Sequence, residues 1–316
     1  MSKKAIIEML RADMRGEHQA IIQYLNHAYS LEWAGVASSI EAIAREEMRH
    51  LDWLAKAIVA LGGDPDLVRD EPDLGAAGPG EQMLKDVALE QQSIDQYRAH
   101  MEAIEDPELL RLLARIVHDE LVHQDQFRDL AEKVAAAMAE PSEPAPERLE
   151  AILNAGVEHE YTVILQYLYH GWVSPDCEEQ KQLEDAAINE MQHMGWLAEG
   201  LQEEGTQASF AHHPPFISRD PIANLEADVD IEDEVTRMYS TQAPEVGSEE
   251  LKSLIQRIRD HEIYHADVFR SLLRQARARK EGQGCACACS EQTQSEGQAA
   301  PAEGTPPAPS IGGLKK

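Results

Sequence analysis

The feature that most constrains the fold of this chain is an internal duplication. The pattern Glu-x-x-His occurs four times, and the two copies in the first half return in the second half at offsets of 143 and 142 residues. The tripeptide Gln-Tyr-Leu that begins at Gln23 also returns at Gln166, an offset of 143. A fixed offset shared by several motifs indicates two copies of one structural unit. The matched motifs are Glu47 to His50 with Glu190 to His193, and Glu120 to His123 with Glu262 to His265.

Each unit is predicted to be all-α. Apolar residues spaced three and four apart predict helices over about 3 to 34, 36 to 61, 81 to 105 and 107 to 139. Gly62 and Gly63, followed by Pro65, predict where the second helix ends, and the Gly-, Pro- and Asp-rich residues 63 to 80 predict a long crossover. The sequence therefore predicts two tandem four-helix bundles at residues 1–139 and 148–280, joined by a Pro-rich linker at 140–147.

The paired motifs predict metal ligands. Three residues advance about 300° around a helix, so the Glu and the His of each motif lie on one face. The other two helices of each unit each carry one matching Glu, and four carboxylates with two imidazoles are the ligand set of a di-metal site in a four-helix bundle. Buried carboxylates are costly without cations, and oxygen-rich donors suit iron or manganese. The candidates are Glu17, Glu47, His50, Glu90, Glu120 and His123 in the first unit, and Glu160, Glu190, His193, Glu232, Glu262 and His265 in the second.

The two units differ beside these candidates. Glu46 is matched by Asn189 and Asp119 by His261, so the outer shells of the two sites are expected to differ. Within the second unit the register of Glu232 is open by one or two positions, because Asp233 follows it directly and another Glu comes next.

The segments EHQAIIQYLNHA, EEMRHLDW and DELVHQD resemble those of ferritin-like di-iron proteins, and bacterioferritin most of all, over about residues 5 to 135 and again 150 to 275. The resemblance implies that Glu47 and Glu120 bridge two irons, that Glu17 and Glu90 are terminal ligands, and that each His binds one iron. The second unit would carry the same roles at its matching positions. By the same resemblance Tyr24 and Tyr167 lie beside the two centres, where core packing with a hydrogen bond to a ligand and a redox role both stay open.

Met48 and Met191 lie inside two of the Glu-x-x-His motifs. In bacterioferritin the methionine at this position holds haem b between two subunits, so the resemblance implies one haem b between Met48 and Met191 if the two units pack as that dimer does. The alternative is that both side chains fill the core, as methionine often does.

The composition excludes several classes of function. The formal net charge of −30 disfavours nucleic-acid or anionic-membrane partners and favours attraction of small cations. The N-terminal residues MSKKAIIEMLRADM carry charges where a signal peptide needs an apolar stretch, and no apolar run is long enough to span a bilayer, so a cytoplasmic protein is expected. The run CACAC could chelate a soft metal or form transient disulfides, and it is not the spaced Cys-x-x-Cys pair of a rubredoxin domain.

The C-terminal residues form a separate region. Residues 281–309, which include CACAC, have no apolar periodicity and are predicted to be a disordered linker. Residues 310–316, SIGGLKK, resemble the C-terminal cargo-loading peptides of proteins that are packaged inside encapsulin shells. The resemblance implies an encapsulin shell protein as partner and a location inside an encapsulin nanocompartment.

These observations favour a ferroxidase that oxidises Fe²⁺ to Fe³⁺ with O₂ or H₂O₂ at two di-iron centres and delivers ferric iron for storage. One alternative is a peroxide-consuming or manganese-catalase-like oxidoreductase. A second is a non-catalytic iron carrier or a structural cargo protein of the shell. The oxidant, the choice between iron and manganese, and assembly into a homo-oligomer stay open.

Overall fold

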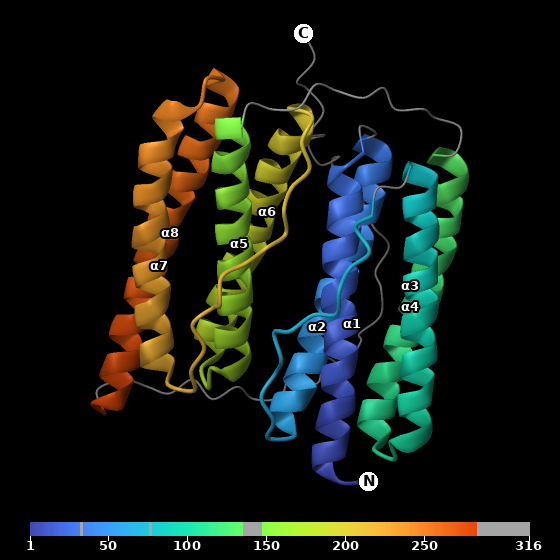
Figure 1. Cartoon of the computed structure of the whole chain (residues 1–316). Helices are drawn as coiled ribbons and strands as arrows, with labels where there is room; N and C mark the ends of the chain where they lie inside the picture. Colours follow the sequence, from blue (N-terminus) through green and yellow to red (C-terminus); the bar gives the residue numbers. More distant parts are fainter. Residues whose placement is uncertain (32–33, 76–77, 135–146, 283–316) are drawn as a thin grey trace, which may run out of the picture.

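The computed structural model describes residues 1–31, 34–75, 78–134 and 147–282, which form two sets of four long helices (Figure 1). No strand occurs among these residues, which confirms the all-α prediction. The first set comprises α1 (Lys3–Tyr29), α2 (Ala34–Ala60), α3 (Pro79–Ala103) and α4 (Pro107–Val134). The second comprises α5 (Glu147–Val173), α6 (Cys177–Glu203), α7 (Pro221–Gln242) and α8 (Glu249–Lys280), with the short 3₁₀ helix η1 (Ala243–Glu245) before α8.

Local sequence sets the ends of these helices. The Asp176 carboxylate accepts the backbone N–H groups of Glu178 and Glu179 and caps the start of α6. Gly62 has φ +84° just after α2, the left-handed conformation that glycine adopts most easily, as the sequence predicted. The predicted extent of α1 to about residue 34 was wrong, because α1 ends at Tyr29. The Ser30 hydroxyl donates to the His27 carbonyl there, and the Leu31 N–H bonds to Ala28, so the last turn tightens and the helix stops.

Each set is a four-helix bundle with one long crossover. The chain runs along α1, returns along α2, crosses the length of the bundle, and then descends α3 and ascends α4 (Figure 1). In both bundles a glutamine of the repeated Gln-Tyr-Leu motif fastens the crossover: the Gln23 side-chain oxygen accepts the Asp73 N–H at 2.8 Å, and Gln166 accepts the Phe216 N–H at 2.9 Å. The repeated tripeptide therefore has a structural role that the sequence alone did not reveal.

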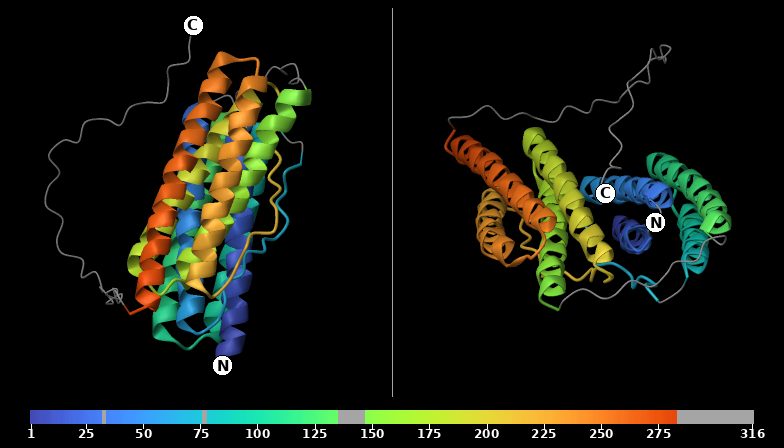
Figure 2. Two further views of the ribbon diagram at one scale, coloured as in Figure 1. Left: turned by 90° about the vertical axis from the view of Figure 1, so that its left-hand side faces the viewer. Right: turned by 90° about the horizontal axis from the view of Figure 1, so that it is seen from above.

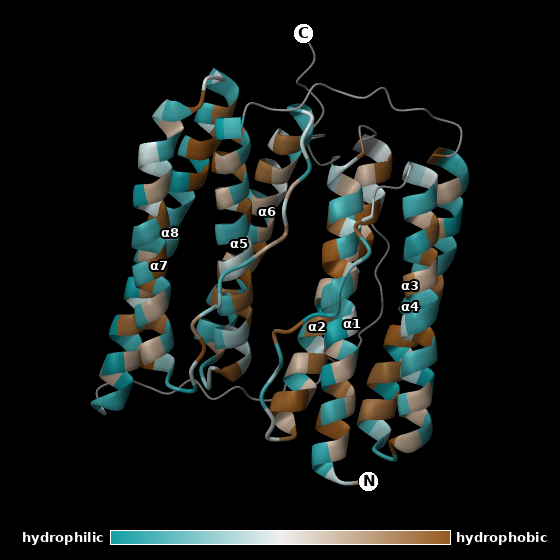
Figure 3. Cartoon of the chain, in the orientation of Figure 1, coloured by the Kyte–Doolittle hydropathy of each residue, from teal (hydrophilic) through white to brown (hydrophobic). Residues whose placement is uncertain are grey.

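The two bundles lie side by side and run in opposite directions (Figures 1 and 2). Helices α1 and α2 contact α5 and α6, and one continuous cluster of buried apolar side chains includes residues of both bundles. Along each helix hydrophobic and hydrophilic residues alternate, as expected for amphipathic helices that bury one face (Figure 3).

Polar contacts also cross this interface. The Tyr161 hydroxyl lies 2.6 Å from His18 Nε2, and both side chains are buried. Near one end of the interface the Trp172 indole N–H donates to Asp52 at 3.1 Å. The two bundles therefore pack as parts of one body, with hydrogen bonds that fix their register.

Several predictions fall partly or wholly outside the described residues. Of the predicted linker at 140–147 only Glu147, the first residue of α5, is described. The predicted linker 281–309 is described only at its first two residues, and the predicted targeting peptide 310–316 not at all. Within the described part of the chain, no helix combines the length and the apolar character needed to cross a membrane.

Candidate metal centres

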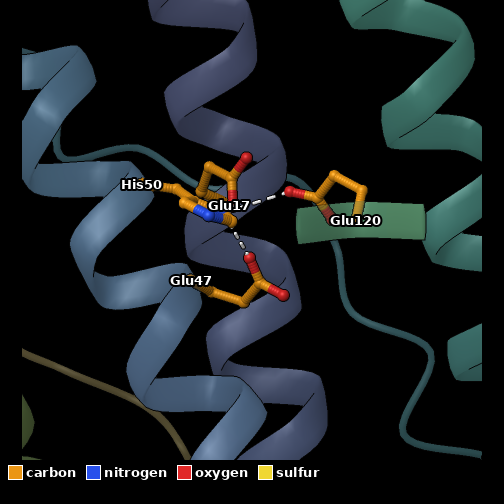
Figure 4. A group of neighbouring side chains, drawn as sticks. All are labelled: Glu17, Glu47, His50 and Glu120. Carbon is orange, nitrogen blue, oxygen red and sulfur yellow. Dashed lines mark hydrogen bonds and ion pairs between the residues drawn. The ribbon is translucent and has the colours of Figure 1, made fainter. Parts of the chain in front are cut away.

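The twelve predicted ligands meet in two clusters, one at the middle of each bundle. Each side chain is at least 96% buried. In each cluster the side chains form two overlapping groups, in which the candidate ligand atoms lie within 4.8 Å of one another. Figure 4 shows the first of these groups, in which Glu17, Glu47, His50 and Glu120 point toward one another from three helices. The second group of that bundle contains Glu90 and His123 with the same two central glutamates.

Two glutamates of the first bundle each reach both imidazoles. Glu47 places Oε2 at 2.8 Å from His50 Nδ1 and Oε1 at 2.8 Å from His123 Nδ1. Glu120 also reaches both imidazoles, with Oε1 at 3.1 Å from His50 Nδ1 and Oε2 at 4.0 Å from His123 Nδ1. Glu17 lies near His50 alone, at 3.5 Å, and Glu90 near His123 alone, at 3.8 Å. This arrangement suits two adjacent cation positions. Glu47 and Glu120 reach both positions and are called the shared glutamates. Glu17 and Glu90 each reach one position, together with one imidazole, and are called the private glutamates.

The second bundle repeats this arrangement. Glu190 lies 2.7 Å from His193 and 2.6 Å from His265, and Glu262 lies 3.0 Å and 3.4 Å from the same two imidazoles. Glu160 is near His193 at 3.9 Å and Glu232 near His265 at 3.6 Å.

The structure also resolves the register of Glu232. Glu232 is buried in the cluster, whereas its neighbour Asp233 faces away and pairs with Arg270 at 2.5 Å. Glu234, the other candidate for the register, is exposed.

Buried tyrosines hold the private glutamates in place. The Tyr24 hydroxyl donates to Glu90 at 2.7 Å, and Tyr167 donates to Glu232 at 2.6 Å. Tyr97, which the sequence matches with Tyr239 but to which it assigns no role, donates to Glu17 from α3. Tyr239 is its counterpart in the second bundle and donates to Glu160. Tyr97 and Tyr239 follow Glu90 and Glu232 by seven residues, so this repeated spacing was the signal that could have identified them.

The donor atoms of both clusters fit cations. Several of them are buried and have no hydrogen-bond partner among the described residues, which is costly unless a cation satisfies them. Although His123 Nδ1 and Glu47 Oε1 are 2.8 Å apart, their geometry is not that of a hydrogen bond. The buried atoms without a hydrogen-bond partner among the described residues are Glu17 Oε2, Glu47 Oε1, Glu90 Oε2, Glu120 Oε1 and His123 Nδ1 in the first bundle, and Glu160 Oε2, Glu190 Oε1, Glu262 Oε1 and His265 Nδ1 in the second.

Burial, together with the crowding of carboxylates, shifts the pKa values of the first cluster. Burial, reinforced by repulsion from Glu120, raises the pKa of Glu17 and of Glu90 well above the usual range. Burial also opposes ionisation of Glu47, but the two imidazoles outweigh it and lower the pKa of Glu47. Although burial by itself lowers the pKa of His123, Glu47 and other carboxylates raise it to about 9. Protons thus partly neutralise the metal-free cluster, and cations can take their place.

The cluster of the second bundle shows the same pattern. Burial first, and then repulsion from Glu262, raises the pKa of Glu160 and of Glu232 well above the usual range. Burial opposes the charged forms of the imidazoles, but the carboxylates raise the pKa of His193 to about 9 and that of His265 to about 10.

Met48 and Met191 line one small cavity between the two bundles. Its other lining residues are mostly apolar and include Ile21, Leu25 and Leu165. The cavity volume is about 20 Å³, which is space for about one water molecule. A tetrapyrrole ring is far larger, so these residues as they pack between the bundles do not fit haem b.

Two clusters of four carboxylates and two imidazoles, each inside a four-helix bundle with one long crossover, define a protein with two candidate di-metal centres. Comparison with protein families finds the ferritin-like domain twice, at residues 7–137 and 150–278. The chain belongs to the ferritin-like family.

A curated bacterioferritin from Desulfovibrio desulfuricans (strain ATCC 27774 / DSM 6949 / MB) is 27% identical over 138 residues, which are 42% of this chain and 77% of that protein. No solved structure matches the chain.

Proposed function

We propose that this chain is a ferroxidase that binds two Fe²⁺ ions in each bundle and oxidises them to Fe³⁺ for storage or detoxification. The observation that carries the proposal is the shared position of Glu47 and Glu120, each within 4.0 Å of both imidazoles of the cluster. Carboxylates so placed hold two substrate cations side by side. The match to a bacterioferritin supports the same chemistry.

The residues of each cluster have separate tasks in this reaction. Fe²⁺ bound there supplies the electrons that reduce O₂ or H₂O₂. The shared glutamates compensate the charge of both ions, while each imidazole turns Nδ1 toward one cation position. Hydrogen bonds from Tyr24 and Tyr97 keep the private glutamates directed into the cluster. The net charge of −30 attracts Fe²⁺ to the protein.

Anaerobic titration with Fe²⁺ followed by mixing with O₂ tests the proposal. We expect a fast rise in ferric absorbance that saturates near about four Fe²⁺ per chain, two for each centre. Glu232→Gln should halve the fast phase, because it removes a private ligand of one centre. Glu234→Gln is the matched control, since this neighbour on α7 is exposed and outside the cluster.

Each alternative function predicts a different result. Metal binding without oxidation would favour an iron carrier or a structural cargo protein. Peroxide turnover without net iron oxidation would favour a peroxidase or a catalase-like enzyme.

We also propose that the protein is loaded into an encapsulin shell through residues 310–316. The support is the resemblance of SIGGLKK to cargo-loading peptides, together with the Gly-, Pro- and Glu-rich tether before it. Deletion of residues 310–316 should abolish co-purification with a co-expressed shell protein and leave the ferroxidase reaction unchanged. Unchanged loading of the deleted protein would refute this proposal and would leave the ferroxidase proposal standing.

A further inference from the structure

The imidazoles of the first cluster use their second nitrogen to contact carboxylates outside it. His123 Nε2 lies 2.9 Å from Glu46, on α2. His50 Nε2 lies 3.5 Å from Asp119, on α4. Since Nδ1 of both rings faces the cluster, each ring is positioned between a cation site and an outer carboxylate.

The matching positions of the second cluster carry no carboxylate. His193 Nε2 lies 2.8 Å from Nδ1 of His261, the residue that matches Asp119. Asn189, which matches Glu46, is exposed and donates its side-chain amide to the Asp185 carbonyl at 3.0 Å. The twelve candidate ligands match between the bundles, but the groups that contact their outer side do not.

This difference changes how strongly each centre attracts a cation. A carboxylate that accepts the outer N–H of a ligand imidazole fixes its orientation and makes it a stronger electron-pair donor. Arg49 and Arg115 pair with Glu46 and Asp119, both at 2.9 Å, but these arginine side chains are 57% and 64% exposed and therefore well screened. In the second bundle Arg257 lies 4.4 Å from the Trp196 ring centroid. Arg257 matches Arg115, and because His261 stands where the first bundle has Asp119, the matching position offers no carboxylate to compensate the charge of Arg257.

We propose that the centre of the first bundle binds divalent cations more tightly than the centre of the second and fills first, with Glu46 and Asp119 as positioning residues. The proposal rests on the proposed function in that it takes both clusters as metal centres. Loss of one outer partner of a metal-bound histidine typically lowers metal affinity by about 10- to 100-fold. We therefore expect a difference of at least about tenfold in Kd between the two centres.

Titration of the metal-free full-length protein with Mn²⁺, followed by the electron paramagnetic resonance signal of the free ion, measures this difference. Mn²⁺ prefers oxygen ligands, so the cysteines of CACAC compete little for it. Glu190→Gln with Glu262→Gln leaves only the first centre, and Glu47→Gln with Glu120→Gln leaves only the second. The first of these proteins should show the lower Kd.

Exchange of the outer residues then assigns the cause. In the protein that keeps only the first centre, Glu46→Asn with Asp119→His should raise the Kd at least about tenfold. In the protein that keeps only the second, Asn189→Glu with His261→Asp should lower it. The second exchange controls for misfolding, because a protein that fails to fold cannot bind Mn²⁺ more tightly. Unchanged thermal unfolding of both metal-free variants would show that the exchanged residues do not act merely through the stability of the fold.

Three outcomes would overturn the inference. Equal Kd values for the two centres, or Kd values that the exchange does not move, would refute it and leave the ferroxidase proposal standing. An absence of Mn²⁺ binding at both centres would also refute the inference. The ferroxidase proposal would then still depend on the Fe²⁺ titration, because carboxylate and imidazole sites bind Fe²⁺ more tightly than Mn²⁺.

Discussion

Addition of divalent cations to the metal-free protein should release protons. A metal-bound imidazole must be neutral at the coordinating nitrogen, and a metal-bound glutamate must be ionised. In the first cluster, burial opposes the charged form of His50 and His123, but the surrounding carboxylates raise the pKa of both. Since the pKa of His123 is raised to about 9, its imidazole is protonated on both nitrogens and charged at pH 7. The pKa of His50 is raised as well, so this imidazole is also charged.

The number of released protons follows from the groups in each cluster. Two imidazoles per cluster give about two protons at pH 7, because the raised pKa values hold those protons until a cation displaces them. Glu17 and Glu90 add up to two more, since their pKa values are raised above the usual range, by burial most of all. Over two clusters the release is therefore about four to eight protons per chain.

Titration with Mn²⁺ in weakly buffered solution with a pH indicator measures this release directly. Repetition at pH 9 under nitrogen supplies the control, because imidazoles with pKa values of about 9 have then lost about half of their protons, while Mn²⁺ at low concentration stays in solution. Release of fewer than about one proton per bound ion at pH 7 would contradict the assignment of charged imidazoles to the metal-free clusters.

Three further predictions concern stability. First, the metal-free protein should lose stability as pH rises from about 6.5 through about 9 to 10, where His123, His193 and His265 lose their protons. A histidine whose pKa is raised in the folded protein stabilises the fold only while it is protonated. Denaturant unfolding at several pH values measures the free energy of unfolding. Second, Tyr161→Phe should cost about 1 to 3 kcal/mol in the same assay, since it leaves buried His18 Nε2 without its hydrogen-bond partner. Third, Gly62→Ala should cost about 1 kcal/mol because φ is +84°, whereas Gly16→Ala in the interior of α1 should stabilise by about 0.5 to 1 kcal/mol.

The fold and the candidate ligands could be predicted from the sequence because both follow from helical geometry and the repeat. A Glu and a His three residues apart must lie on one helix face, so Glu47 and His50 are tied together before any tertiary contact is known. The repeat then supplied the same pair in the second unit. The single inward Glu on each remaining helix was harder to assign, because no second ligand in the same helix fixes its position. The open register at Glu232 is an example.

Other features could not be predicted because they join residues that are distant in the sequence. The repeated spacing from Glu90 marks Tyr97, but the partner that Tyr97 donates to, Glu17, lies 80 positions away and no local pattern indicates it. The meeting of His18 and Tyr161 depends on how the two bundles pack. The end of α1 depends on a competition between the Ser30 hydroxyl and the backbone that apolar periodicity does not register.

The position of the differences between the two bundles also bears on function. Trp53 matches Trp196, and their ring centroids lie 5.7 Å and 5.6 Å from those of His50 and His193, so this aromatic contact is the same in both bundles. The changes fall instead on Glu46 and Asp119, whose side chains contact the outer nitrogens of candidate ligands. A symmetric pair of identical chains must carry the same residues around both centres, whereas two units in one chain can differ. The duplication therefore permits two centres with the same ligands and different affinities, which could be loaded in order from one supply of Fe²⁺.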